Sequence, residues 1–246
     1  MSGHSKWHNI QAKKGKADAA RGRIFTKIGR EIAVAAKMGS DPNVNSKLAD
    51  AIAKAKAANM PNDNIIRSIK KAAGELSSTN YEVLTYEGYG AGGSAVIVET
   101  LTDNKNRTVG DVRHVFDKCG GAMGATGCVA FMFDRKGVLV VERTPNLTED
   151  DMMEIAIEAG ADDVATEDDA FIVYTTPSDF SAVRKALEEK NLSFLEAEVQ
   201  MVPQNKVELS EEDTAKFMKM VDLLEDLDDV QEVWHNVVLP EEEDED

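Results

Sequence analysis

The sequence predicts an α+β protein, with an N-terminal three-helix bundle followed by two α/β sandwich-type domains. Before residue 80, apolar residues recur at helical spacing, whereas short β-branched runs alternate with helical segments beyond it. Residues 137–203 follow the order β-α-β-β-α-β, which is typical of a ferredoxin-like domain. We expect four parts: a basic arm and helical bundle (1–80), an α+β domain (81–134 plus 205–239), an inserted ferredoxin-like domain (135–204) and an acidic tail (240–246).

The three helices of the bundle are predicted from periodicity and stop signals. Ile24, Ile28 and Ile32 recur every four positions, so they place one apolar face on the first helix. Gly39 and the Asp41-Pro42 pair end this helix, and Met60-Pro61 separates the other two. The predicted helices span about residues 17–38, 46–59 and 62–74.

Connectivity beyond residue 80 predicts that one domain is inserted in another. A continuous second domain would leave the last helix and strand without a sheet, so 81–134 and 205–239 should fold together. Thr148 and Asp151 form a candidate capping box at the start of one helix. The predicted helices are 109–118, 148–159, 179–190 and 210–227; the predicted strands are 81–86, 95–101, 129–133, 138–142, one near 164, 171–175, 195–202 and 230–239.

Charge is divided unevenly along the chain. The formal net charge is −17, but residues 1–80 contain 15 Lys and Arg against six Asp and Glu, a net of +9. The remainder therefore has a net charge of −26, including the acidic run Glu241–Asp246. This asymmetry indicates a basic binding end joined to acidic domains that should repel polyanions and could engage basic proteins.

The first helix carries the strongest functional signal. Lys16, Arg23, Lys27, Arg30 and Lys37 fall within an arc of about 80° on a helical projection. Such a row suits phosphate contacts, although an ordinary solvated face is the simpler alternative. Trp7 can stack on a base or anchor the arm to the bundle. The predicted nucleic-acid-binding residues are Lys6, Trp7, Lys13, Lys14, Lys16, Arg21, Arg23, Lys27, Arg30 and Lys37.

A second, weaker candidate is the polar segment from Thr102 to Thr108. Asn104, Asn106 and Arg107 can contact phosphate or base edges, but turn formation and helix capping are the simpler interpretation. Asp226, Asp228 and Asp229 lack the glycine and terminal glutamate of a calcium loop.

No motif predicts an enzyme, a cofactor or a metal site. The glycines from Gly88 to Gly93 precede a β-branched run, which indicates a hairpin connection and not a dinucleotide site. Cys119 and Cys128 lack zinc-ligand spacing, and the pair His4 and His8 has no neighbouring carboxylate or cysteine. Without a secretory segment or an apolar run of about 18 residues, we expect a cytoplasmic protein with no membrane contact. The oligomeric state is left open.

Several blocks of sequence resemble the YebC/PmpR family across nearly the whole chain. They are Gly3–Trp7, Arg21-Gly22 with Phe25–Lys27, Arg30–Ile32, Ala58–Pro61, Tyr86–Gly90, Thr102–Thr108, Lys118–Gly121 and Asp229–Val233 with His235-Asn236. The resemblance implies a helical N-terminal domain and two α/β domains, one inserted in the other. It implies a DNA-binding transcriptional regulator or, as the alternative, a ribosome-associated translation factor that binds ribosomal RNA. An enzyme acting between the α/β domains is the third reading, and the missing catalytic motifs argue against it.

Overall fold

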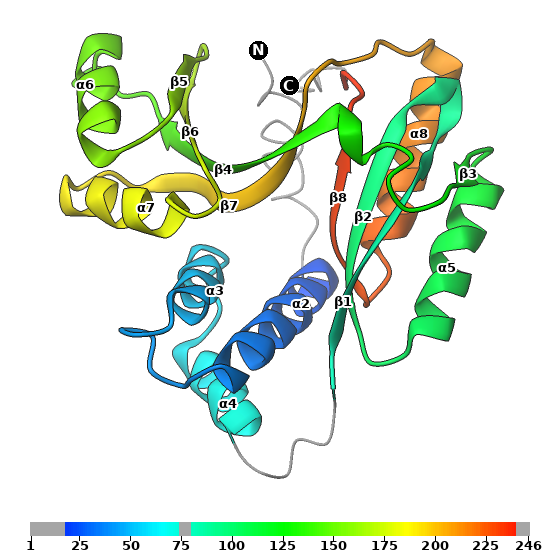
Figure 1. Ribbon diagram of the computed structural model, residues 1–246, viewed down its shortest axis with the longest axis horizontal. Coiled ribbons are helices and arrows are strands. Elements are labelled where there is room, and N and C mark those ends of the chain that lie inside the picture. Colours follow the sequence, from blue (N-terminus) through cyan, green and yellow to red (C-terminus); the bar gives the residue numbers. More distant parts are fainter. Residues whose placement is uncertain (1–17, 74–79, 240–246) are drawn as a thin grey trace. The chain divides into compact units, whose positions relative to one another are not determined.

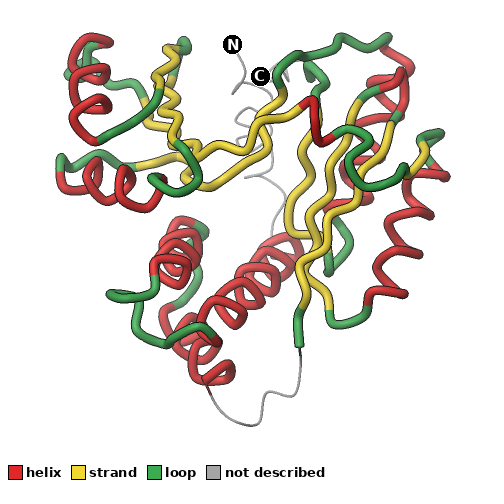
Figure 2. Tube along the Cα trace, in the orientation of Figure 1, coloured by secondary structure: helices red, strands yellow, loops and turns green. Residues whose placement is uncertain are grey.

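The computed structural model describes residues 18–73 and 80–239 (Figures 1 and 2). These residues form helices and two four-stranded sheets, which confirms the predicted α+β class. They divide into two compact units: residues 134–202 form one, and the remaining described residues form the other. None of the described helices has the length and apolar character that crossing a membrane requires.

Three helices form the N-terminal bundle: α2 (Asp18–Lys37), α3 (Ser46–Ala57) and α4 (Asn62–Ala73). Ile32 and Leu48 are fully buried in their shared core, and several alanines let the helices approach closely. Asn45 connects the first two helices. Its side chain accepts a hydrogen bond from the Leu48 backbone N–H and donates to the carbonyls of Ala35 and Gly39.

The first sheet joins two segments that are far apart in the sequence. Strands β1 (Glu82–Tyr89), β2 (Ala95–Thr102), β3 (Ala122–Met123) and β8 (Val230–His235) lie in the order β3-β1-β2-β8, and every pairing is antiparallel. Helices α5 (Lys105–Lys118) and α8 (Glu211–Glu225) pack on this sheet. Phe116 of α5 and Phe217 of α8 are fully buried against Val96 and Val98 of β2.

The second sheet belongs to the other unit and has ferredoxin-like connectivity. Its elements are β4 (Phe133–Glu142), α6 (Glu149–Ala159), β5 (Asp163–Thr166), β6 (Ala170–Thr175), α7 (Phe180–Glu189) and β7 (Phe194–Pro203). The strand order β5-β6-β4-β7 places the first and last strands side by side. The predicted capping box is confirmed, because Thr148 and Asp151 cap the start of α6 reciprocally.

Several elements differ from the predictions, and β1 also extends three residues beyond its predicted end. Helix α5 begins at Lys105, one turn earlier than predicted, because Asn104 caps it and the polar first turn hides its helical pattern. The predicted strand at 129–133 is mainly the short helix η2 (Ala130–Met132). The sequence Asp134-Arg135-Lys136-Gly137 predicts a turn between two strands, but β4 runs continuously through it. Gly137 reads as a turn residue but lies in a strand, where Thr175 and Phe180 occupy the space of a side chain. The two-residue β3 was not predicted, and β8 ends at His235.

Candidate nucleic-acid interface

Five of the predicted cations lie on helix α2. Arg23, Lys27, Arg30 and Lys37 occupy this helix at the predicted spacing, and Arg21 is exposed near its start. Lys6, Trp7, Lys13, Lys14 and Lys16 lie outside the described residues. Within the described residues, the candidate surface is therefore the side of α2 that carries Arg23, Lys27 and Arg30, and the partners of these cations determine what this surface can bind.

The loop between α8 and β8 meets the cations of α2. Arg23 Nη2 pairs with Asp226 Oδ1 at 2.9 Å, and Lys27 Nζ donates to the Glu225 carbonyl at 2.8 Å. Arg30 Nη1 donates to the Asp228 carbonyl at 2.7 Å and to Asp229 Oδ1 at 2.9 Å. We name residues 225–229, which comprise the last residue of α8 and the loop that follows it, the acidic loop. These three side chains are therefore paired within the chain, by a segment about 200 residues away in the sequence, and their binding to nucleic acid stays a prediction.

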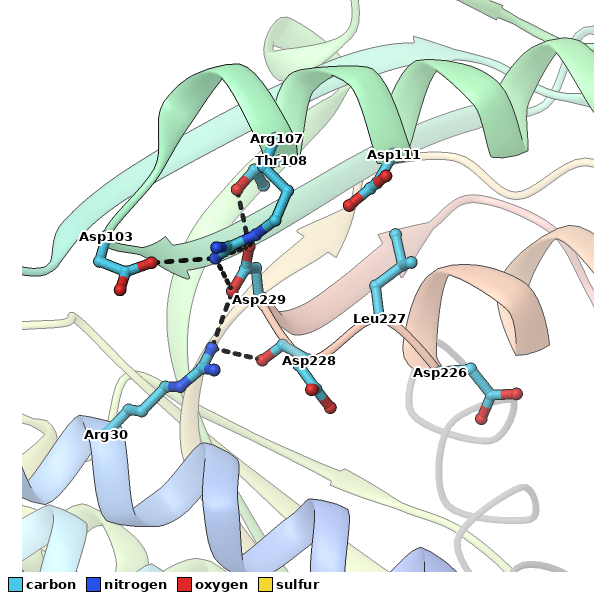
Figure 3. Close-up of a pocket in the computed structure, with 9 residues that line it drawn as sticks. All are labelled: Arg30, Asp103, Arg107, Thr108, Asp111, Asp226, Leu227, Asp228 and Asp229. Carbon is cyan, nitrogen blue, oxygen red and sulfur yellow. Dashed lines mark hydrogen bonds and ion pairs between the residues drawn. The ribbon is translucent and has the colours of Figure 1, made fainter.

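Asp229 is the centre of a buried polar cluster (Figure 3). Arg107 holds its carboxylate with both Nη2, at 2.7 Å from Oδ2, and Nε, at 3.1 Å from the same oxygen. The hydroxyls of Thr108 and Thr102 donate to Oδ2 at 2.8 and 3.2 Å. With Arg30 bound to Oδ1, one carboxylate connects the bundle, the start of α5 and the start of β8.

This environment fixes the charge of Asp229. Burial disfavours the ionised form, but the hydrogen bonds from Arg107 and Thr108, the Arg107 charge and the Arg30 hydrogen bond outweigh it and lower the pKa of Asp229. The pKa of Arg107 is raised by its hydrogen bonds to Asp229 and Asp103. Both groups are therefore ionised at neutral pH, and the contact with Arg30 is an ion pair.

A pocket of about 550 Å³ opens beside this cluster. It is lined by Arg30, Asp103, Arg107, Thr108, Asp111, Asp226, Leu227, Asp228 and Asp229. Carboxylates outnumber guanidinium groups, and both arginines already hold Asp229. Within the described ranges, no group of His, Cys, Asp and Glu side chains is arranged to hold a metal ion.

The secondary candidates separate in the structure. Asn104 caps α5 by accepting a hydrogen bond from the Arg107 backbone N–H at 3.1 Å, so the capping interpretation is confirmed. Asn106 is exposed, and Arg107 belongs to the Asp229 cluster. Lys37 lies apart from this cluster, with its Nζ donating to Asn80 Oδ1 at 3.4 Å. The structure therefore brings Arg30 and Arg107 together on Asp229. The sequence pattern did not predict this role, because Asp229 stood out only as part of an aspartate group that lacks the other residues of a calcium loop.

Comparison with known proteins identifies the relatives of the chain. Residues 5–75 match the family model described as the TACO1/YebC protein N-terminal domain, and residues 81–237 match that of the TACO1/YebC second and third domain. The chain belongs to the YebC/PmpR family. The resemblance inferred from the sequence blocks is thus confirmed, and both α2 and the acidic loop fall within the matched regions of this YebC/PmpR chain.

Relatives of this YebC/PmpR chain match it over nearly its full length. A protein of Acetivibrio thermocellus is 61% identical over 96% of this chain and 98% of its own. One from Clostridium botulinum strain Alaska E43 is 62% identical over 98% of both chains, and each carries the name "Probable transcriptional regulatory protein". The crystal structure of a conserved hypothetical protein from Aquifex aeolicus is similar, with a TM-score of 0.81 and 45% identity over 92% of this chain and 93% of that one.

Proposed function

We propose that this YebC/PmpR chain is a nucleic-acid-binding regulatory protein, and specifically a DNA-binding transcriptional regulator that uses its basic N-terminal domain. The observation that carries the proposal is the concentration of cations: residues 1–80 have a net charge of +9 in a chain of net charge −17. Arg23, Lys27 and Arg30 then follow one side of a single helix. The names of the relatives support a regulatory role.

The cations suit phosphate better than base edges. Arginine and lysine neutralise phosphates, whereas sequence-specific reading requires side chains presented in a groove. On α2, the cations already bind carboxylate and carbonyl oxygens, which are the same kind of acceptor that a phosphodiester offers. We therefore propose binding that depends on backbone phosphates, without an enzymatic step, a cofactor or a metal.

The test compares two charge variants of the full chain. One replaces Lys13, Lys14 and Lys16 of the arm by Gln. The matched control replaces Lys56, Lys70 and Lys71 by Gln, which removes the same charge from exposed positions of α3 and α4, outside the cationic stripe of α2 that Arg23, Lys27 and Arg30 form. Affinity for duplex DNA and for a ribosomal RNA fragment is measured by fluorescence anisotropy between about 50 and 200 mM salt.

We expect the arm variant to bind less tightly. Its slope of log K against log salt should fall by about two to three, at roughly 0.7 to 0.9 for each phosphate that the arm no longer neutralises. The control should keep most of the wild-type slope. Equal decreases in the two variants would contradict a defined cationic surface. Weaker binding to ribosomal RNA with unchanged binding to DNA would replace the transcriptional proposal by the translational alternative.

A further inference from the structure

The bundle and the first sheet have separate hydrophobic cores. The buried cluster of the bundle includes Ile32 and Leu48, whereas the cluster of the sheet includes Phe116 and Phe217, and the two clusters have no described residue in common. The two cores are therefore built from different residues. The contacts of Arg23, Lys27 and Arg30 with the acidic loop are polar, while Leu227 of the same loop packs against the core of the sheet.

Polar contacts connect these two parts instead. Arg23, Lys27 and Arg30 bind Asp226, the Glu225 carbonyl and Asp229, respectively, and on α3 Lys54 Nζ pairs with Glu232 Oε1 at 2.9 Å. Arg23 and Asp226 are both substantially exposed, at 42% and 58% of their side-chain surfaces. Ion pairs at such exposure are weakened by salt and exchange readily with other ions.

The partners of the stripe resemble the groups that it would bind in a nucleic acid. A carboxylate oxygen and a phosphate oxygen both accept charge-assisted hydrogen bonds from arginine. Arg30 shows this most clearly, because Asp229 Oδ1 and the Asp228 carbonyl both accept hydrogen bonds from its Nη1. A phosphate cannot take these donors while the acidic loop holds them.

We propose that the acidic loop is an autoinhibitory latch, in which Asp226 and Asp229 occupy the cations of α2 and must release them before these cations bind a polyanion. The inference rests on the proposed function and adds a regulatory step to it. Asp229 is the main element of the latch because its side chain is only 8% exposed and its partner Arg30 only 19%. Asp226 is the outer, weaker element.

The latch can be tested by removing one negative charge at a time from the full chain. Asp229→Asn keeps the size of the side chain but weakens its hold on Arg30, and Asp226→Asn removes the pair with Arg23. Asp222→Asn is the matched control. Asp222 is exposed on α8, one turn before Asp226, and within the described ranges it forms no side-chain hydrogen bond or ion pair. Thermal unfolding checks that each variant is folded.

Two kinds of probe separate the latch from the proposed function. Heparin reports how available the cations are to any polyanion, while duplex DNA and a ribosomal RNA fragment report nucleic-acid binding. We expect Asp229→Asn to raise heparin affinity about fivefold or more, the lower end of typical coupling between two sites. Asp226→Asn should raise it less, and Asp222→Asn least, since it changes only the overall charge.

An equal effect in all three variants would overturn the latch. If Asp229→Asn does not fold, the comparison of Asp226→Asn with Asp222→Asn decides in the same way, with equal affinities overturning the proposal. Heparin affinities in the expected order, with no binding of DNA or RNA by any variant, would support the latch and refute the proposed function. Salt-dependent nucleic-acid binding with equal heparin affinities of the three variants would refute the latch and support the proposed function.

Discussion

At the scale of single residues, the buried carboxylates of Asp229 and Glu87 determine local structure that no sequence motif predicts. Asp229 holds the start of α5, the start of β8 and Arg30 of the bundle together. Glu87 similarly holds the backbone of the glycine-rich segment after α5. Its carboxylate accepts hydrogen bonds from the backbone N–H groups of Gly127, Val129 and Ala130 at 2.7, 2.9 and 2.8 Å. Each carboxylate satisfies donors that burial would otherwise leave unpaired.

The charge of Glu87 should be visible in the pH dependence of stability. Burial disfavours its ionised form, but the three backbone donors prevail and lower the pKa from its ordinary value of 4.5. The ionised group therefore stabilises the folded protein above that pH, and this contribution is lost as the pH falls through the folded pKa.

We expect Glu87→Gln to lower the free energy of unfolding by about 1–3 kcal/mol at pH 7, because an amide N–H₂ then faces backbone donors. The difference from wild type should shrink towards pH 3. Glu82→Gln on the same strand is the control, since this exposed side chain pairs only with exposed Lys105 among the described residues and should change stability by less than about 1 kcal/mol. Urea unfolding at both pH values measures the effect, and a difference independent of pH would contradict the assignment.

At the scale of elements, local signals predicted the helices well and the contacts between them poorly. Apolar spacing, with the stop signals Gly39, Asp41-Pro42 and Met60-Pro61, places the three bundle helices within about two residues. Thr148 likewise marks the start of α6. Helix α5 was predicted too short because its first turn is polar, and its one clear signal is the capping residue Asn104. The Arg30–Asp229 pair could not be predicted, since 199 positions separate its members and no local pattern relates them.

The unit formed by residues 134–202 should be removable. The chain enters it at Phe133 on β4 and leaves it at Pro203 on β7, and these strands are neighbours. The backbone N–H of Gln204 donates to the Met132 carbonyl at 2.9 Å, so the two ends of a deletion would already lie side by side.

A variant in which a short Gly/Ser linker joins Phe133 to Pro203 should keep the sheet of β1, β2 and β8 and unfold cooperatively. The reason is that the core around Phe116 and Phe217 contains no residue from the deleted segment. Circular dichroism during thermal unfolding measures this against the wild-type transition. A variant without a cooperative transition would show that residues 81–239 fold as one undivided domain.

At the scale of the whole molecule, the division of charge has two consequences. The sequence predicted a basic binding end and acidic domains that repel polyanions, and this part of the account stays a prediction. The structure adds that the acidic part of the chain contacts the basic part directly, through Asp226 and Asp229. A net charge of −17 therefore conceals an internal pairing as well as an uneven distribution.

The most direct test of the central claim is the salt dependence of nucleic-acid binding after the stripe itself is neutralised. Arg23, Lys27 and Arg30 are replaced together by Gln in the full chain, because Glu would face Asp226 and Asp229. The variant with Lys56, Lys70 and Lys71 replaced by Gln again serves as the control. The account predicts weaker binding to DNA of unrelated sequences and a slope of log K against log salt reduced by about two to three. A folded stripe variant with the same affinity and slope as the control would contradict it and leave α2 as a structural helix.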